Sequence, residues 1–381
     1  MKVAFLTTDS REHFKDYGNP QPYFGTAPEA LLEGFKSMPE NIEVHVISCL
    51  QRKPISSPSK LADNIYYHAL HVPNIGWMKT GYQGCIRSVR QKIREIRPHI
   101  AHGQGTERDC AMEAVFSGIP NVLTIHGNMR LVAKFLGAHP FSYYWIAARL
   151  ERFCLQKSDG VVAISRYTEQ AAKPFARKTW LLPNPVHPSY FKVNRTHNER
   201  SIVFCAAAIG ERKNQLGLIR ALEPLRAQFD FEVRFAGAGQ NDDPYFQEFG
   251  ATLSRSSWCT YLGSLNRDEL QQQLASTCLA VLPSFEDNCP MVILEAAAAG
   301  VPVAASRVGG IPDLIRIEET GLLFDPTSPV QIAEAIRRIL LDRPFAARIS
   351  ANARAEATAR FDPRVIAEGH LEIYREVLKR L

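Results

Sequence analysis

Apolar runs of strand length alternate with helix-like segments along the first half of the chain. The strand-like runs lie at residues 3–7, 44–48, 99–103, 122–126, 160–165 and 179–182. The helix-like segments lie at residues 28–37, 84–97, 108–116 and 141–156. Strands that are separated by helices indicate a parallel sheet with helices on both faces.

The second half of the chain repeats this pattern. Its strand-like runs lie at residues 202–207, 231–236, 260–262, 277–282, 301–304 and 321–324. Three helical segments, 329–341, 345–359 and 363–381, close the chain. Between the halves, residues 183–200 contain three prolines and little periodicity, which is typical of a linker. We therefore predict an N-terminal domain at 1–186, a C-terminal domain at 187–362 and a last helix at 363–381.

The segment 283–300, PSFEDNCPMVILEAAAAG, predicts a strand end, a sharp loop and a buried helix that Pro290 opens and Gly300 ends. The loop carries Glu286, Asp287 and Asn288, and Glu295 lies inside the apolar helix. Burying such a carboxylate is costly unless it is hydrogen-bonded. A solvated glutamate and helix-cap charges would also explain these acids. Their position after a strand favours a ligand site, because open α/β sheets bind ligands at the carboxyl ends of their strands.

Two cations lie in the turn between a predicted strand and a predicted helix. Arg212 and Lys213, at the positive end of a helix dipole, suit a diphosphate, although a solvated basic turn is the simpler alternative. After the next strand, Gly239 lets backbone approach a ligand or a packed helix. The stretch is not a GxGxxG fingerprint, and the chain has no GKS or GKT phosphate loop.

In the first half, His126 ends a predicted strand and is a candidate for the ligand site, with a histidine satisfied inside a turn as the alternative. Glu107, after the preceding strand, is a weaker candidate for contact with substrate. His68 and His71 have no nearby carboxylate or cysteine, so we expect no metal site there.

Composition adds a charge asymmetry. The chain of 381 residues has a net charge of +6, and residues 1–190 hold 23 Lys/Arg against 15 Asp/Glu. This half is expected to bind an anionic partner, and the basic helix at 84–97, near Trp77 and Tyr82, is either a solvated face or a membrane contact.

The aromatic residues at 141–145 are interpreted as core. No apolar run reaches ~20 residues, no secretory signal is recognised, and eight scattered cysteines favour reduced thiols in the cytoplasm.

Taken together, these segments resemble the retaining nucleotide-sugar glycosyltransferases of family four, the group 1 type, over nearly the whole chain. The strongest match is the family's acid-x7-Glu signature, which Asp287 and Glu295 reproduce, or Glu286 with a shift of one residue. Further matches are TIHG at 124–127, LPN at 182–184, VGGIPDLI at 308–315 and TGLLFDP at 320–326. Ala208 replaces the family's separate arginine, for which Arg212 is the substitute, and only Gly25 remains of its N-terminal glycine pair.

The resemblance implies the GT-B fold, with two Rossmann-like domains facing a central cleft and a C-terminal helix that returns to the N-terminal domain. It implies that Glu295 binds the ribose of the donor and that Arg212 and Lys213 bind its diphosphate. The rest of the donor would be bound by Asp287 or Glu286, together with Asn288, Gly239 and Gly25. His126 would contact the sugar.

The predicted activity is retaining hexosyl transfer to a glycan, lipid-linked or small-molecule hydroxyl, without metal or cofactor. The expected partners are a nucleotide sugar and this acceptor, not nucleic acid. The expected location is the cytoplasm, either free or peripheral at the inner face of the membrane. A sugar-nucleotide epimerase of the same fold and a non-catalytic sugar-nucleotide-binding protein remain alternatives.

Overall fold

The computed structural model describes residues 1–196 and 201–380 and divides the chain into two units. Unit 1 comprises residues 1–187 and 362–381, and unit 2 comprises residues 188–361. The last residues of the predicted linker, 197–200, lie outside the described part, as does Leu381 at the end of the last predicted helix. Each unit has a parallel sheet of its own, as the alternating pattern predicted.

Unit 1 is built on an eight-stranded sheet with the order β3-β4-β2-β1-β5-β6-β7-β8. The strands are β1 (Lys2–Leu6), β2 (Glu43–Leu50), β3 (Lys60–Ala62), β4 (Ile65–His71), β5 (Ile100–Gln104), β6 (Asn121–Ile125), β7 (Gly160–Ala163) and β8 (Thr179–Leu181). All neighbouring pairs are parallel except β3 and β4. The central strands are buried on both faces, because helices cover the sheet from each side, and they therefore read as continuous apolar runs.

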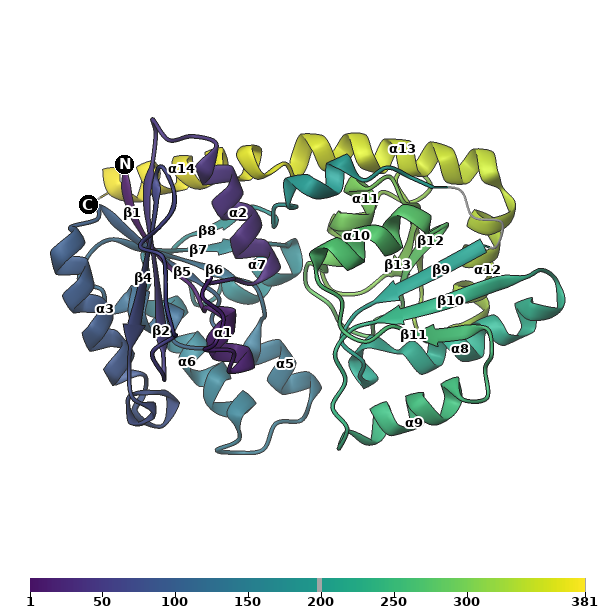
Figure 1. Ribbon diagram of the computed structural model, residues 1–381, viewed down its shortest axis with the longest axis horizontal. Helices are drawn as coiled ribbons and strands as arrows, with labels where there is room; N and C mark the ends of the chain where they lie inside the picture. Colours follow the sequence, from purple (N-terminus) through teal and green to yellow (C-terminus); the bar gives the residue numbers. More distant parts are fainter. Residues whose placement is uncertain (197–200, 381) are drawn as a thin grey trace. The chain divides into compact units, whose positions relative to one another are not determined.

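Helices follow most strands of unit 1. They are α1 (Ser10–Phe14), α2 (Thr26–Lys36), α3 (Gln83–Ile96), α4 (Cys110–Val115), α5 (Met129–Phe135), α6 (Tyr143–Lys157), α7 (Arg166–Ala172) and α14 (Pro363–Lys379). The last helix, α14, comes from the far end of the chain and lies beside α2 in Figure 1. Its apolar stripe joins the core of unit 1, where the hydroxyl of Tyr374 hydrogen-bonds Nδ1 of His102 at 2.5 Å. The predicted return of the last helix to the N-terminal domain is therefore confirmed.

Three short helices of unit 1 were not predicted. They are α1, α5 and α7, each of five to seven residues, which is too short for a helical period to stand out. The first is fixed by a buried ion pair, since Asp9 caps the helix and holds the guanidinium of Arg11 at 2.7 Å. Arg11 also donates to the carbonyl oxygens of Asn19 and Ser56, which anchors the long loop before α2. A tertiary contact, not local propensity, decides this element.

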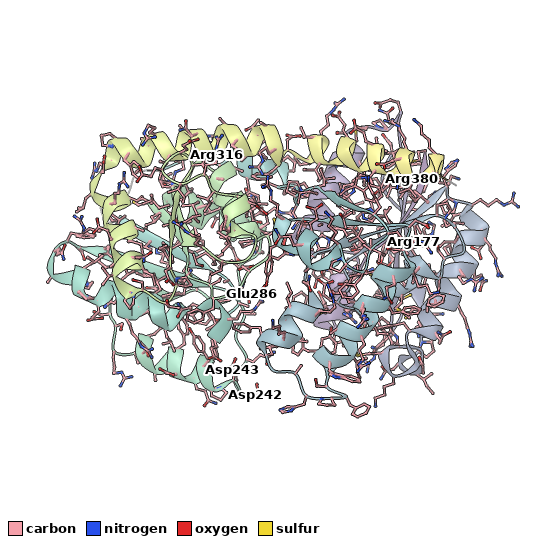
Figure 2. All side chains as sticks on the ribbon, turned by 180° about the vertical axis from the view of Figure 1, so that it is seen from behind. Arg177, Asp242, Asp243, Glu286, Arg316 and Arg380 are labelled. Carbon is pink, nitrogen blue, oxygen red and sulfur yellow. The ribbon has the colours of Figure 1, made fainter. Side chains whose placement is uncertain are left out.

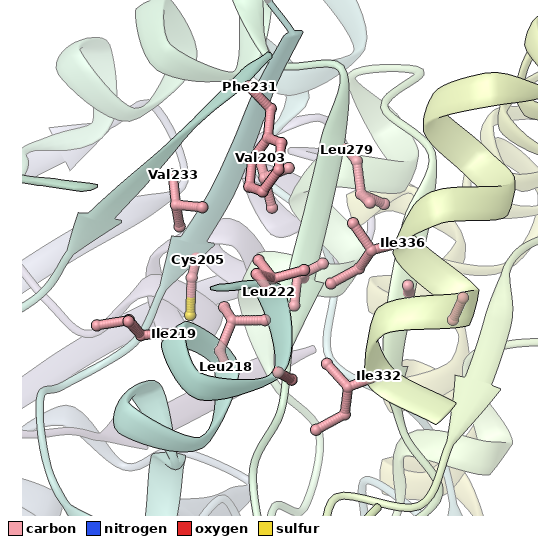
Figure 3. Close-up of a cluster of buried hydrophobic side chains, with 14 of the residues drawn as sticks. Val203, Cys205, Leu218, Ile219, Leu222, Phe231, Val233, Leu279, Ile332 and Ile336 are labelled. Atoms are coloured by element: carbon pink, nitrogen blue, oxygen red, sulfur yellow. The ribbon is translucent and has the colours of Figure 1, made fainter. Parts of the chain in front are cut away.

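Unit 2 contains a six-stranded parallel sheet with the order β11-β10-β9-β12-β13-β14. The strands are β9 (Ser201–Ala206), β10 (Phe231–Ala236), β11 (Cys259–Tyr261), β12 (Leu279–Leu282), β13 (Val303–Ser306) and β14 (Leu322–Phe324). Its helices are α8 (Gln215–Leu222), α9 (Pro244–Leu253), α10 (Arg267–Ser276), α11 (Met291–Ala298), α12 (Pro329–Leu341) and α13 (Arg343–Arg360). Figure 3 shows how Val203 and Leu279 of the sheet pack against Leu222 and Ile336 of two covering helices.

None of the helices in the described part of the chain combines the length and the apolar character that crossing a bilayer requires.

The contact of α2 with α14 leads to a first prediction. Gly34 of α2 lies so close to α14 that an added Cβ would overlap the carbonyl oxygen of Pro363. Gly34→Ala is expected to destabilise unit 1 by about 1–3 kcal/mol, because a packed backbone has no room for the methyl group. Urea unfolding followed by circular dichroism measures the change.

Gly250 is the matched control for this substitution. It also lies inside a helix, but no heavy atom lies within 4 Å of an added Cβ. Gly250→Ala is therefore expected to stabilise by about 0.5–1 kcal/mol through helix propensity alone. Equal effects of the two substitutions would contradict the close packing of α2 on α14.

Candidate functional site

Two loops of unit 2 leave the carboxyl ends of β9 and β12, which are neighbours in the sheet. The strand β9 pairs with β10 on one side and with β12 on the other. The connections from β9 and from β12 therefore run in opposite directions across the sheet. Such a reversal of strand order opens a crevice where doubly wound sheets bind ligands. The loop after β9 carries Arg212 and Lys213, and the loop after β12 carries Glu286 and Asp287.

The charged residues of the two loops form matched pairs. Nη1 of Arg212 lies 2.7 Å from Oε2 of Glu286, which is labelled in Figure 2, and Nζ of Lys213 contacts Oδ2 of Asp287. The same oxygen of Asp287 accepts from the hydroxyl of Ser284 at 3.2 Å. Arg212 is the most exposed member, with 36% of its side chain accessible. A guanidinium has five N–H donors, so Arg212 keeps donors for an anion beyond those used on Glu286.

Asn214 joins the loops through its side-chain amide. It has a left-handed backbone with φ of 57°, which asparagine tolerates better than most residues. Its Nδ2 donates to the carbonyl oxygens of Pro283 and Pro326, each at 3.2 Å. The amide of Phe285 also donates to the carbonyl of Arg212 at 2.8 Å. Sequence reasoning missed Asn214, although an asparagine between a turn and a helix was the available signal.

A third loop closes on Asp287 through a glycine. Gly309 has φ of 54°, and an added Cβ would overlap the carbonyl oxygen of Asp287. The next amide, of Gly310, donates to that oxygen at 3.0 Å. The predicted turn at Gly309 and Gly310 is therefore present. It contacts the backbone of the acidic loop at Asp287, whereas the loop after β9 contacts the side chain of Asp287.

Glu295 of α11 is buried, as its apolar helix predicted, and only 3% of the residue is accessible. Burial raises the pKa of its carboxyl to about 7, while a hydrogen bond from Tyr190 and the charge of Arg267 act in the opposite direction. Its Oε1 has no hydrogen-bond partner among the described residues. An acceptor buried without a donor is costly, so this oxygen is suited to a ligand hydroxyl.

In unit 1, His126 lies after β6 in a polar network. Its Nε2 donates to Oε1 of Gln104 at 2.9 Å, and Asn184 also hydrogen-bonds the ring. Desolvation lowers the pKa of His126 to about 4, so the ring is neutral near pH 7. It can take part in a hydrogen bond with a sugar hydroxyl but brings no positive charge. Gln104 was not singled out in the sequence, where an isolated amide carries no signal, whereas Asn184 belongs to the LPN segment that contributed to the family resemblance.

Glu107 lies partly buried next to the backbone that follows His126. Its carboxylate accepts from the amide of Gly127, and burial raises its pKa to about 7. Glu151, which sequence reasoning missed, accepts from the hydroxyl of Thr106 at 2.6 Å and from the amide of Met129 at 2.8 Å. Both carboxylates hold loops at the carboxyl edge of the sheet, which gives Glu107 a positioning role besides the predicted contact with substrate.

The remaining predicted residues are placed as follows. Gly25 precedes the first turn of α2 in unit 1, and Asn288 is buried in the acidic loop of unit 2. Gly239 packs against the ring of Phe246, with which an added Cβ would overlap. Close packing against the helix that carries Phe246 therefore explains the glycine at position 239.

The interpretation of the aromatic residues at 141–145 as core was wrong for the exposed ones, whereas Trp77 and Tyr82 are buried in the core under α3 and so offer no contact to a membrane beside the basic helix. Phe141, interpreted as core, is 81% accessible, and Tyr143 and Tyr144 are also exposed. They begin or precede α6, whose amphipathic pattern does not extend to its first residues. Local sequence could not tell which aromatic group the helices would cover.

Comparison with known proteins identifies the two halves separately. The model of the family "Glycosyl transferases group 1" matches residues 187–356, and that of "Glycosyltransferase Family 4" matches residues 31–190. The glycogen synthase of Mycobacterium tuberculosis is 34% identical over 299 residues, which cover 74% of this chain and 69% of that protein. The chain belongs to the group 1 glycosyltransferases. The predicted family is thereby confirmed.

Other similarities of this glycosyltransferase-family chain are more distant. The GDP-mannose-dependent alpha-(1-6)-phosphatidylinositol monomannoside mannosyltransferase of M. tuberculosis is 29% identical over 190 residues, 47% of this chain and 48% of that protein. Among the first curated relatives, the matched regions span only 47%, 29% and 48% of the relatives' lengths. HepE of Anabaena, solved with UDP-glucose, superposes with a TM-score of 0.69 at 20% identity, over 100% of both chains. That likeness confirms the predicted GT-B fold.

The unusual pKa of Glu295 predicts a pH-dependent stability. An unfolded carboxyl ionises near pH 4.5 and the folded one near pH 7, so the unfolded state holds fewer protons between these values. Stability therefore falls as pH rises through this window. Glu295→Gln removes the ionisable group and with it this loss of stability. The free energy of unfolding of the variant should therefore match that of the wild type near pH 4 and exceed it by up to about 3 kcal/mol at pH 8.

Urea unfolding at both pH values measures this difference. Glu248→Gln, at an exposed carboxylate of α9 that pairs with Arg220, is the control and should follow the wild-type pH profile. A stability difference between Glu295→Gln and wild type that stayed the same at pH 4 and pH 8 would show that Glu295 ionises in its ordinary range.

Proposed function

We propose that the chain transfers a hexose-type sugar from a nucleotide diphosphate to a hydroxyl acceptor, with retention of anomeric configuration and without a metal. The observation that carries the proposal is the convergence of Arg212 and Lys213 with two acids at the β9–β12 crevice, beside the segment that contains Glu295. A binding protein needs cations for a diphosphate. Cations that are held rigidly by carboxylates also suit a leaving group whose charge grows in the transition state.

Each residue of the crevice has a defined task in this proposal. The unpartnered Oε1 of Glu295 accepts from a ribose hydroxyl. Arg212 and Lys213 bind the diphosphate and stabilise it as the bond to the sugar breaks. Asp287 and Glu286 keep the two cations in place, and one of the two carboxylates, Asp287 or Glu286, also holds donor-sugar hydroxyls.

Retention follows in this proposal from a front-face displacement. The acceptor oxygen attacks on the side from which the phosphate leaves, and the departing phosphate oxygen takes the acceptor proton. His126 is neutral at pH 7 and hydrogen-bonds the sugar, because a charged imidazolium there would oppose a developing positive charge on the sugar ring. No enzyme nucleophile is required.

The known proteins support this activity in general terms. The mannosyltransferase relative is named for GDP-mannose, and HepE was solved with UDP-glucose, so both donor bases remain in question for this chain. A sugar-nucleotide epimerase of the same fold is disfavoured, because the matching families and relatives are glycosyltransferases. A non-catalytic binding protein is distinguished from a transferase by turnover.

A thermal-shift panel without added metal tests donor binding. UDP, GDP, ADP and their hexose conjugates are compared, and one base family is expected to raise the melting temperature, because a ligand of the folded state stabilises it. Lys213→Gln should abolish the shift and lower transfer by about 10²–10³-fold, while its amide can still hydrogen-bond Asp287. The anomeric configuration of the product, read by NMR, decides retention.

Arg220→Ala is the control for this experiment, because Arg220 is an exposed cation of the same unit and pairs only with Glu248 in the described contacts. It should keep both the thermal shift and the transfer rate. Binding without turnover by the wild type would leave a sugar-nucleotide-binding protein. Full activity of Lys213→Gln would remove the crevice from the mechanism.

We propose further that unit 1 of this cytoplasmic enzyme contacts an anionic membrane surface and takes a lipid-linked acceptor there. Residues 114–150 contain Arg130, Lys134 and Arg149 and no acid. The exposed groups of this segment form an aromatic-basic surface around the α5–α6 connection, where both helices lie side by side in Figure 1. Its residues are Lys134, Phe135, Leu136, Phe141, Tyr143, Tyr144 and Arg149. Aromatic side chains next to cations are typical of membrane-interface contacts.

Sedimentation with vesicles tests the aromatic-basic surface. At low salt, the wild type should bind vesicles that contain phosphatidylglycerol and not vesicles of phosphatidylcholine alone, because each nearby cation contributes about 1 kcal/mol of attraction. Phe135→Ser combined with Phe141→Ser should abolish binding. Arg87→Gln with Arg90→Gln, on the exposed face of α3, is the control and should leave most binding intact. Negligible binding by the wild type would exclude the membrane contact.

A further inference from the structure

Four potential metal ligands meet in the core of unit 1, and none of them belongs to the residues assigned to the sugar or its acceptor above. They are Cys49 near the end of β2, Cys85 on α3, and Asp109 and Glu113 at the start of α4. One donor atom of each lies within 4.8 Å of the donor atoms of the other three, and all four residues are buried. Among the described residues, no other group of three or more histidines, cysteines or acids converges in this way.

The two acids of this Cys-carboxylate cluster form no ion pair with a described cation, although the charge of Arg108, which also faces Glu12, acts on Asp109. Neither Asp109 nor Glu113 forms an ion pair with a described lysine, arginine or histidine, and the neighbouring Arg108 lies over the ring of Trp77 and 3.9 Å from Glu12. Two carboxylates buried side by side cannot both stay charged unless something compensates them. Either protons or a bound cation must supply that compensation.

Asp109 does not cap α4, although it occupies the N-cap position of that helix. It stands at the N-cap of α4, where an aspartate normally accepts from an amide of the first turn, but its side chain makes no such bond. The carboxylate is engaged with Glu113 instead. The thiol of Cys49 in turn lies 3.1 Å from Oε1 of Glu113 and interacts with Cys85. The four side chains are therefore directed at one another, and Asp109 in addition hydrogen-bonds a backbone amide.

The donor set selects a class of cation. Two sulfur and two oxygen atoms suit a borderline-soft divalent ion, whereas Mg²⁺ and Ca²⁺ prefer oxygen alone. Zinc–ligand bonds of about 2.0–2.3 Å put the donors of a tetrahedral site about 3.3–3.8 Å apart. The Cys49–Glu113 pair, at 3.1 Å, is slightly closer than this spacing, and a pair at the 4.8 Å limit has to close by about 1–1.5 Å.

We propose that Cys49, Cys85, Asp109 and Glu113 bind one zinc-type divalent cation that joins β2, α3 and α4. The bonds formed are four metal–ligand bonds, and the thiol and carboxyl protons pass to solvent, so no electron is transferred. Four protein ligands leave no open position, which makes the ion structural and not catalytic.

Metal analysis of the full chain tests this proposal. After exposure to equimolar Zn²⁺ and desalting, mass spectrometry should find about one zinc per chain, and Co²⁺ should give a sulfur-to-metal charge-transfer band. Cys49→Ala and Cys85→Ala should each lower retained zinc to a tenth or less. Chelation should lower the melting temperature of the wild type and leave that of the two variants unchanged.

Cys154→Ala is the matched control, because Cys154 is buried in the same hydrophobic core and contacts Met112, outside the Cys-carboxylate cluster. It should retain one zinc. A wild-type chain that binds neither Zn²⁺ nor Co²⁺, or alanine variants that bind as the wild type does, would overturn the proposal and leave a proton-sharing network. If an alanine variant fails to fold, the Co²⁺ spectrum of the wild type decides, since a bound ion without the sulfur band excludes the cysteines.

Discussion

The pairing of two oppositely charged loops is the interaction on which the site of unit 2 depends. Glu286 and Asp287 are adjacent in the chain and mostly buried, so their like charges would repel each other without compensation. Arg212 and Lys213 come from the neighbouring strand and compensate both charges. Asn214 and Gly310 then fix the backbone of these loops. The crevice is thus rigid because its charges are paired within the protein.

The histidines near the carboxyl edge of unit 1 are neutral. Desolvation lowers the pKa of His126 to about 4 and that of His370 to about 3, and it keeps His102 neutral as well. Their contacts are with amides and hydroxyls, among them Gln104 and Tyr374. This edge of unit 1 therefore combines neutral histidines with acidic groups such as Glu107 and with the Glu151–Arg130 pair, whereas the loops after β9 and β12 of unit 2 carry two charged pairs.

The Cys-carboxylate cluster and Glu295 illustrate one physical rule in two places. In both, acidic groups lie in a core that cannot solvate them, and hydrophobic packing of the surrounding helices holds them there. Glu295 keeps one oxygen without a partner, whereas Asp109 and Glu113 turn toward each other and toward thiols. Burying an acidic group without compensation costs free energy, and a bound ligand or ion can supply that compensation. Each of the two arrangements therefore suggests a ligand.

The sequence by itself determined the two parallel sheets, because strands buried on both faces read as continuous apolar runs between helical segments. It also determined the segment from Asp287 to Glu295, where Pro290 and the alanines specify a buried helix. Tertiary structure alone decided which side chains meet. Lys213 and Asp287 are 74 residues apart, and Cys49 and Glu113 are 64 apart, so no local pattern could pair them.

The same reason explains the errors at the surface. The exposure of Phe141 and the burial of Trp77 depend on which helix covers which ring, and that choice is made by packing between distant segments. The short helix α1 likewise exists because Asp9 and Arg11 form a buried pair with partners from residues 19 and 56. The hydrophobic periodicity of a segment predicts which of its faces is buried. Which other segment covers that face is decided only when the chain folds.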